Sequence, residues 1–275
     1  MPRLAIYTAI IDQYDSALQP GFGEPTADVD YFCYTDNELP LPKTIERRLW
    51  KRKHRDATRD AREIKIQAFK DFKDYDWVVW IDANCTINAT EIKHYLNEQS
   101  SPSHPIKVLA HDVRNCLYQE AQWAFVEAAD SPARISHQIN RYNEAGFPAN
   151  FGLANTNLLI RKPTNPTAIH FSNCWLKQLS AGSRRDQLSF DFVRWQQNIQ
   201  IDTIPGIWYD NRFCKRTTDH VRKAYRAPFH KTMITEWIRR ILYADDLFHE
   251  VLYDHRGAQN TTSSEASKQP DSQKL

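Results

Sequence analysis

A five-residue apolar run that ends in an acidic residue constrains this chain more than any other feature. The run Trp77-Val78-Val79-Trp80-Ile81 leads directly into Asp82-Ala83-Asn84. A nearly unbroken apolar run of this length is typical of a parallel strand that is covered on both faces. Ligands of open α/β sheets bind just outside the carboxyl ends of such strands, so we expect Asp82 to lie at a ligand site.

Asp82 and Asn84 are two residues apart, and in extended chain they point to the same side. A carboxylate and an amide oxygen suit hard cations such as Mg²⁺ or Mn²⁺, which hold diphosphates in many proteins. The alternative is that Asp82 caps the strand and begins an Asx-turn. The remaining motifs favour the ligand site.

Strand and helix patterns alternate along the chain, which predicts an α/β fold with a parallel sheet. We expect further strands at Leu4–Ile11, Asp30–Asp36, Thr44–Trp50, Lys107–Ala110, Thr156–Arg161 and Ile201–Ile204. We expect helices at Asp56–Lys73, Glu91–Glu98, Tyr118–Ala129, Pro132–Ala145, Pro166–Leu179 and Arg185–Asn198.

The C-terminal part differs in composition. We expect one α/β domain over residues 1–230, followed by an amphipathic helical extension over residues 231–255. This extension contains Trp237-Ile238-Arg239-Arg240, and packing on the core is favoured over a position on a membrane surface. From Arg256 the chain is rich in Ser, Thr, Gln and Lys, which predicts a disordered tail over residues 256–275.

Charge and glycine content exclude some functions. The net charge of +2 argues against nucleic acid as the main partner, although the basic residues gather in two clusters that suit an anionic substrate. The chain has only 7 Gly and contains neither GxGxxG nor GxxxxGK[ST]. A nucleotide would therefore need a cradle other than a glycine-rich phosphate loop.

Cysteine spacing indicates a reducing compartment. The five Cys residues are widely separated and form no CxxC pair, a pattern typical of free thiols. Neither a signal peptide nor an apolar stretch of about 20 residues is visible, so we expect a cytoplasmic protein. Peripheral association with the inner face of the membrane is the alternative that the C-terminal extension leaves open.

Three further motifs carry candidate chemistry. Arg55, Arg59, Arg62 and Lys65 share one face of a predicted helix, where they would meet a diphosphate or else form a solvated surface. The segment Arg185-Asp186-Gln187 opens a helix, so Asp186 either caps that helix or serves as a carboxylate that grips sugar hydroxyls or acts as nucleophile or base.

His111-Asp112-Val113-Arg114 follows another predicted strand, and Glu120 lies further along in the next helix. His111, Arg114 and Glu120 are candidates for an acceptor pocket. A buried His with a structural salt bridge is the competing interpretation.

These motifs together resemble a known family. The matching segments, in order, are Tyr7-Thr8-Ala9-Ile10 with Tyr14-Asp15, Phe32-Cys33-Tyr34-Thr35-Asp36-Asn37, Ala61-Arg62-Glu63-Ile64-Lys65, Trp80-Ile81-Asp82-Ala83-Asn84, His111 with Arg114 and Tyr118-Gln119-Glu120-Ala121, Gly152-Leu153 with Leu159-Ile160-Arg161, and Arg185-Asp186-Gln187-Leu188-Ser189-Phe190. They resemble the glycosyltransferase-like family shared by bacteria and plants that includes the plant mucilage-related and turgor-regulation-defect proteins.

The resemblance implies a GT-A type, Rossmann-like mixed sheet flanked by helices, distantly similar to the glycogenin-like transferases. It implies that Thr8, Ala9 and Asp36 line a nucleoside pocket and that Arg62 and Lys65 meet the diphosphate. It assigns Asp82 and Asn84 to a Mn²⁺ or Mg²⁺ ion, with His220 as a later ligand, and Arg185, Asp186 and Gln187 to the donor sugar or the reacting carbon. Asn84 stands where a DxD motif has its second carboxylate. The ligands would then carry one negative charge fewer, so the metal would be bound more weakly.

The resulting expectation is a metal-assisted glycosyltransferase that moves a sugar from a nucleotide-diphosphate donor, a UDP-sugar, to a glycan or glycoconjugate. Retention of the anomeric configuration would fit the distant relatives and would place Asp186 on the reacting face of the sugar. Two alternatives remain: a metal-dependent hydrolase on the same site, and a binding module without catalysis.

Overall fold

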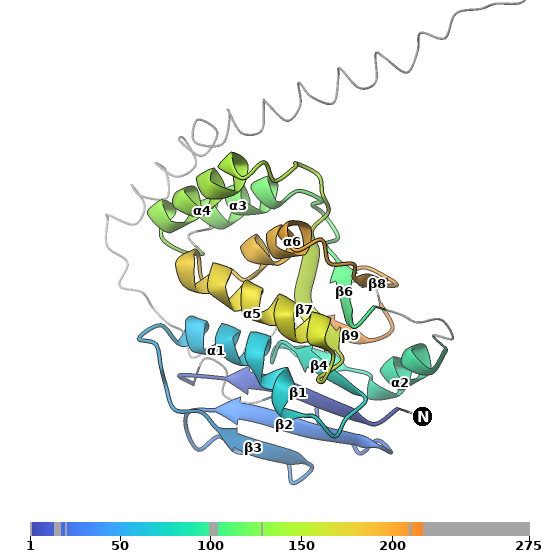
Figure 1. Cartoon of the computed structure of the whole chain (residues 1–275). Coiled ribbons are helices and arrows are strands. Elements are labelled where there is room, and N and C mark those ends of the chain that lie inside the picture. Colours follow the sequence, from blue (N-terminus) through green and yellow to red (C-terminus); the bar gives the residue numbers. More distant parts are fainter. Residues whose placement is uncertain are drawn as a thin grey trace, which may run out of the picture.

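The computed structural model describes residues 2–13, 18–19, 21–98, 104–127, 129–208 and 211–216. These residues form a mixed sheet with helices on both faces (Figure 1). The strands of this sheet are β1 (Leu4–Ile10), β2 (Val29–Thr35), β3 (Ile45–Leu49), β4 (Trp77–Ile81), β6 (Ile106–Ala110), β7 (Ala154–Arg161) and β8 (Asp202–Ile204). The prediction of an α/β fold is therefore confirmed.

Within the described residues, the seven strands of this sheet lie in the order β3-β2-β1-β4-β7-β6-β8. Strands β1 to β4 are parallel to one another, as the sequence predicts. Strand β7 instead runs antiparallel between β4 and β6. Its first residues therefore lie at the same edge of the sheet as the last residues of β4 and β6, with Leu158 opposite Ile81 and Ala154 opposite Ala110. We call this edge the carboxyl edge.

Both faces of the sheet are covered. One face packs against α1 (Ala57–Gln67), α5 (Pro166–Ala181) and α6 (Gln187–Gln196), and α3 (Leu117–Val126) and α4 (Pro132–Glu144) pack in turn around α6. The other face packs against α2 (Ala89–Glu98) and a small sheet of β5 (Cys85–Ile87) with β9 (Cys214–Arg216). All five residues of β4 are buried, which explains its unbroken apolar sequence.

Helix α1 begins as predicted and ends earlier. The Asp56 side chain accepts a hydrogen bond from the Thr58 N–H and so caps the helix. The helix stops at Gln67, and a 3₁₀ turn continues over Ala68–Asp71, where the sequence predicts α-helix to Lys73. The buried Arg161 guanidinium donates to the carbonyl oxygens of Lys65 and Ile66, and this satisfies two acceptors at the helix end.

Several boundaries move by a few residues, and two short strands are new. Helices α3 and α6 both end before the predicted Ala129 and Asn198. Strands β5 and β9 are too short for a periodicity signal, and their pairing brings the residues after Asp82 against a segment about 130 residues later.

The predicted C-terminal extension, the disordered tail and His220 lie outside the described residues. The domain boundaries and the cytoplasmic location therefore stay predictions. Within the described part, no helix has both the length and the apolar character that crossing a membrane requires.

Candidate functional site

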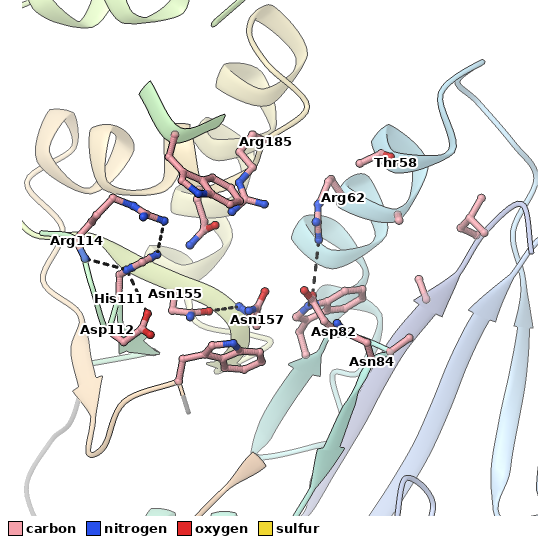
Figure 2. Close-up of a pocket in the computed structure, with 18 of the residues that line it drawn as sticks. Thr58, Arg62, Asp82, Asn84, His111, Asp112, Arg114, Asn155, Asn157 and Arg185 are labelled. Carbon is pink, nitrogen blue, oxygen red and sulfur yellow. Dashed lines mark hydrogen bonds and ion pairs between the residues drawn. The ribbon is translucent and has the colours of Figure 1, made fainter. Parts of the chain in front are cut away.

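A pocket of about 480 Å³ opens at the carboxyl edge (Figure 2). Its size is within the range of small-molecule sites in proteins. The lining residues come from the ends of β1, β4 and β6, the start of β7, helices α1 and α3, the start of α6 with the loop before it, the loop before α3 and the segment after β8. They are Ala9, Ile11, Ala57, Thr58, Ala61, Arg62, Trp80, Asp82, Ala83, Asn84, His111, Asp112, Val113, Arg114, Trp123, Asn155, Asn157, Arg185, Gln187 and Trp208.

The first wall of the pocket is formed by β4 and α1. Asp82 directly follows β4, and its carboxylate accepts a hydrogen bond of 2.8 Å from the indole N–H of Trp80. Arg62 Nη1 lies 3.7 Å from the same carboxylate oxygen, and Lys65 Nζ lies 3.6 Å from it. The Asp82 side chain therefore faces two cations. This is not the strand-end capping role that was the alternative interpretation of Asp82.

Asp186 lies behind this wall. Its carboxylate is 2.7 Å from Lys65 Nζ and 3.1 Å from Arg62 Nε, and it accepts a hydrogen bond of 2.9 Å from Thr156 Oγ1. The Asp186 side chain is only 3% exposed. Burial alone would raise the pKa of Asp186, but the charges of Arg62 and Lys65 outweigh burial and hold that pKa well below its usual range.

The second wall is built around a buried carboxylate. Glu120 on α3 is fully buried, and it accepts hydrogen bonds of 2.8 Å from Arg114 Nε and 2.9 Å from Arg185 Nη2. The Cζ atom of each guanidinium group also lies 5.1 Å from the ring centroid of Trp123. These contacts fix two arginines from different loops in one orientation at the edge of the pocket.

His111 shapes the loop after β6. Its Nδ1 accepts hydrogen bonds from the backbone N–H groups of Val113 (3.2 Å) and Arg114 (3.1 Å). Burial lowers the pKa of His111, and the charge of Glu120 opposes this only in part. The ring is therefore neutral at pH 7. Asp112, the next residue, also lines the pocket.

The floor between the two walls comes from β7. The backbone N–H of Asp82 donates to the carbonyl oxygen of Asn157, and that of His111 donates to the carbonyl oxygen of Leu153. These two hydrogen bonds continue the β4–β7 and β6–β7 strand pairings past the ends of β4 and β6. They attach both walls of the pocket to β7. Figure 2 shows Asn155 and Asn157 between them. The Gln187 side chain lies close by and donates to the carbonyl oxygen of Ala154.

The structure brings eight of the predicted residues into this one pocket: Ala9, Arg62, Asp82, Asn84, His111, Arg114, Arg185 and Gln187. Lys65, Glu120 and Asp186 lie directly behind its walls and do not line it. Thr8 is fully buried within β1, beside Ala9. Asp36 follows β2 further along the carboxyl edge, where it accepts a hydrogen bond from the Asp12 N–H and lies 3.4 Å from Arg52.

Sequence reasoning did not select Asp112, Asn155, Asn157, Trp123 and Trp208 as site residues. Asp112 belongs to the strand-end motif His111-Asp112-Val113-Arg114, from which His111 and Arg114 were the candidates. Asn155 and Asn157 alternate at the start of a strand, a position that reaches the carboxyl edge only if the strand is antiparallel. The two tryptophans carry no local signal that separates them from core residues.

The donor set at Asp82 and Asn84 fits a cation that arrives with a diphosphate. Mg²⁺ is usually held by one or two carboxylates together with substrate phosphates and water, and these two residues supply one carboxylate and one amide oxygen. In the described part of the chain, no group of three or more His, Cys, Asp or Glu side chains could hold a metal ion on its own.

Comparison with known families identifies the relationship. The family model "TOD1/MUCI70, glycosyltransferase-like domain" matches residues 48–218, which is more than half of the chain. This chain belongs to that family. The matched region runs from the end of β3 past β9, so the TOD1/MUCI70 domain includes both walls of the pocket. Membership of a glycosyltransferase-like family supports a transferase activity.

Among solved structures, this TOD1/MUCI70 domain is similar to the apo structure of the bifunctional glycosyltransferase WbbM, with 13% sequence identity and a TM-score of 0.47. The similarity covers 74% of this chain and 39% of the WbbM chain. No curated protein matches the chain by sequence.

Proposed function

We propose that this protein is a GT-A type glycosyltransferase that moves a sugar from a nucleotide-diphosphate donor, a UDP-sugar, to a glycan or glycoconjugate acceptor. The observation that carries the proposal is the pocket at the carboxyl edge, which has Arg62 and Asp82 on one wall and the Arg114–Glu120–Arg185 cluster on the other. Family membership over residues 48–218 supports the same reaction class.

The order of strands suggests how the donor lies. Asp36 follows β2 and Ala9 is in β1, so the nucleoside would lie at this end of the carboxyl edge. The diphosphate would then reach Arg62 and Asp82 beside β4, and the sugar would lie over the start of β7. The acceptor would enter against His111 and Arg114, beyond β7. This arrangement follows the rule that ligands of open α/β sheets bind across the carboxyl ends of the strands.

The main chemical task is to stabilise the charge of the departing nucleoside diphosphate. Arg62 is the cation on α1 that reaches the pocket, and its guanidinium is pinned against Asp82 and Asp186. A Mn²⁺ or Mg²⁺ ion bound by Asp82 and Asn84 would supply further positive charge at the leaving group. His220 remains a proposed additional ligand.

We assign Asp186 and Lys65 a positioning role. The two oxygens of Asp186 are occupied by Arg62, Lys65 and Thr156, and the side chain is almost fully buried. A carboxylate in this state is a poor nucleophile and does not reach a sugar in the pocket. Its effect on catalysis would act through the orientation of Arg62.

The test is a melting-temperature panel of UDP, GDP, CDP and their sugars, each with and without Mn²⁺. Ligands that bind only the folded state raise the melting temperature by mass action. We expect a rise that depends on one nucleotide, that Mn²⁺ increases, and that is lost in Asp82→Ala. The absence of a shift with every nucleotide would contradict the donor site.

Turnover separates the remaining alternatives. A transferase consumes the nucleotide-sugar faster when its acceptor is present, whereas a hydrolase on the same metal would cleave amides or phosphoesters. A binding module would hold the ligand but turn over neither, and Asp82→Ala would then change binding alone.

A further inference from the structure

Asp112 is a buried carboxylate that faces the pocket without a hydrogen-bond donor among the described residues. Its side chain is 7% exposed, and it contributes to the pocket lining. Among the described residues, the titratable group beside it is the neutral His111 ring, with Nδ1 3.3 Å from Asp112 Oδ1. The Asp112 oxygens are not among the fully buried polar atoms without a hydrogen-bond partner, so they are accessible from the pocket.

Other groups of the chain engage both ring nitrogens of His111. Its Nδ1 already accepts hydrogen bonds from two backbone N–H groups, those of Val113 and Arg114. Its Nε2 lies 3.3 Å from Arg114 Nη2, a group that can only donate. Arg114 and Arg185 are both held by Glu120. The Asp112 carboxylate faces the pocket, where it is placed to accept a hydrogen bond from a hydroxyl group of a substrate.

The position of Asp112 relative to the proposed leaving group is defined by the sheet. Asp82 follows β4, Asp112 follows β6, and β7 lies between these two strands. Two strand spacings separate the backbones by about 10 Å. Figure 2 shows Asp112 and His111 on one side of the pocket, with Asp82 and Arg62 on the other. The pocket between these walls has a volume of about 480 Å³, which is enough for a sugar ring.

We propose that Asp112 is the general base that removes the proton from the acceptor hydroxyl group. The inference rests on the proposed glycosyltransferase function. The acceptor oxygen forms a bond to the anomeric carbon while the bond from that carbon to the diphosphate oxygen breaks. The electron pair leaves with the diphosphate on the Arg62 side, and the proton passes to the Asp112 carboxylate, which later releases it to water.

This geometry has a stereochemical consequence. A base and a leaving group on opposite walls require in-line attack from the face opposite the leaving group, which inverts the anomeric configuration. The expectation of retention, which gave Asp186 a place on the reacting face, does not agree with a buried Asp186 whose oxygens are all engaged.

The experiment uses the full chain and the donor that the melting panel selects, with water as the acceptor. The variant is Asp112→Asn, and the matched control is Glu144→Gln, which removes an exposed carboxylate from the end of α4. Three quantities are measured: the rate of nucleotide release, the affinity for the free nucleoside diphosphate, and the anomer first released by the wild type, followed by NMR.

We expect Asp112→Asn to lower the rate about 100-fold or more, because general base catalysis contributes ~10²–10⁴-fold. Its nucleotide affinity and melting temperature should match those of the wild type, and Glu144→Gln should change none of the three. The wild type should release the sugar with inverted configuration. This last readout needs no variant, so it holds even if Asp112→Asn folds poorly.

Two results would overturn the assignment while leaving the transferase intact. One is normal nucleotide affinity with an Asp112→Asn rate within about 3-fold of the wild type, since a lost general base costs far more than this. The other is release of the retained anomer. A wild-type protein that binds no nucleotide would instead overturn the proposed function, and the role of Asp112 with it.

Discussion

Lys65 Nζ lies 2.7 Å from the carboxylate of Asp186, and both side chains are buried between α1 and the loop that precedes α6. Thr156 on β7 joins the pair, because its hydroxyl accepts from Lys65 and donates to Asp186. One ion pair therefore connects α1, β7 and α6 directly behind the pocket. The pair also contacts both residues of the first wall, since Asp186 lies 3.1 Å from Arg62 and Lys65 lies 3.6 Å from Asp82.

Removal of one partner of this pair should be costly for stability. Asp186→Asn leaves Lys65 as a buried charge with less compensation, and we expect the free energy of unfolding to fall by about 3–5 kcal/mol. Lys65→Met should have a similar effect. In the double variant the loss should be smaller than the sum of the two, because both charges are gone. Urea unfolding of the four proteins measures this coupling.

The Arg3–Asp30 pair is the matched control, because its two side chains are about half exposed. Asp30→Asn should change the free energy of unfolding by less than about 1 kcal/mol. Equal losses for Asp30→Asn and Asp186→Asn would show that the pair behind the pocket has no special structural role.

Arg62→Gln should weaken binding of the nucleoside diphosphate. The substitution removes a charged hydrogen-bond donor, which contributes about 1.5–3 kcal/mol, so the dissociation constant should rise about 10- to 100-fold. Arg55→Gln is the control, because Arg55 is exposed just before the same helix and does not line the pocket. Calorimetric titration with UDP measures both. Equal affinities of the two variants would contradict contact between Arg62 and the diphosphate.

Metal binding should depend on the nucleotide. Two carboxylates, Asp82 and Asp186, lie against two cations, Arg62 and Lys65, so this group has no net charge to attract a free cation. We expect Mn²⁺ alone to change the melting temperature little and Mn²⁺ with UDP to raise it more than UDP does. EDTA should reverse the additional rise. A large shift with Mn²⁺ alone would mean that more ligands contribute than Asp82 and Asn84.

Asp191 should make the stability depend on pH. Burial raises its pKa to about 6, although Arg194 (3.3 Å) and the Ala154 N–H (2.7 Å) oppose the shift. The ordinary value is 3.8, so the folded protein binds more protons than the unfolded chain between about pH 4 and 6. The contribution of Asp191 is therefore full below about pH 4 and is lost as the pH rises through 6.

The shift of about 2 pKa units corresponds to about 3 kcal/mol. Asp191→Asn removes the titration and keeps an oxygen for the Ala154 N–H. The difference in unfolding free energy between Asp191→Asn and the wild type should thus move in favour of the variant from pH 4 to pH 7. Denaturant unfolding across this range measures it, and a difference that stays constant with pH would show that Asp191 is ionised throughout.

Local patterns were enough for the parts of the fold that depend on neighbouring residues. The apolar run before Asp82 predicted a buried strand, and Asp56 predicted the start of α1, because strand burial and helix capping are both properties of a short segment. The antiparallel direction of β7 was not predicted. Strand direction depends on which strands become neighbours, and this is decided by long-range packing.

The same division holds within the pocket. The sequence by itself determined that Asp82, Asn84, His111 and Arg114 follow strands and that Arg62 faces away from the apolar side of its helix. Only the tertiary structure decided that Lys65 and Asp186 form a buried pair behind the pocket while Asp112 faces into it. Burial and pairing of a charge depend on contacts between segments more than 100 residues apart, as between Lys65 and Asp186, and no local pattern records them.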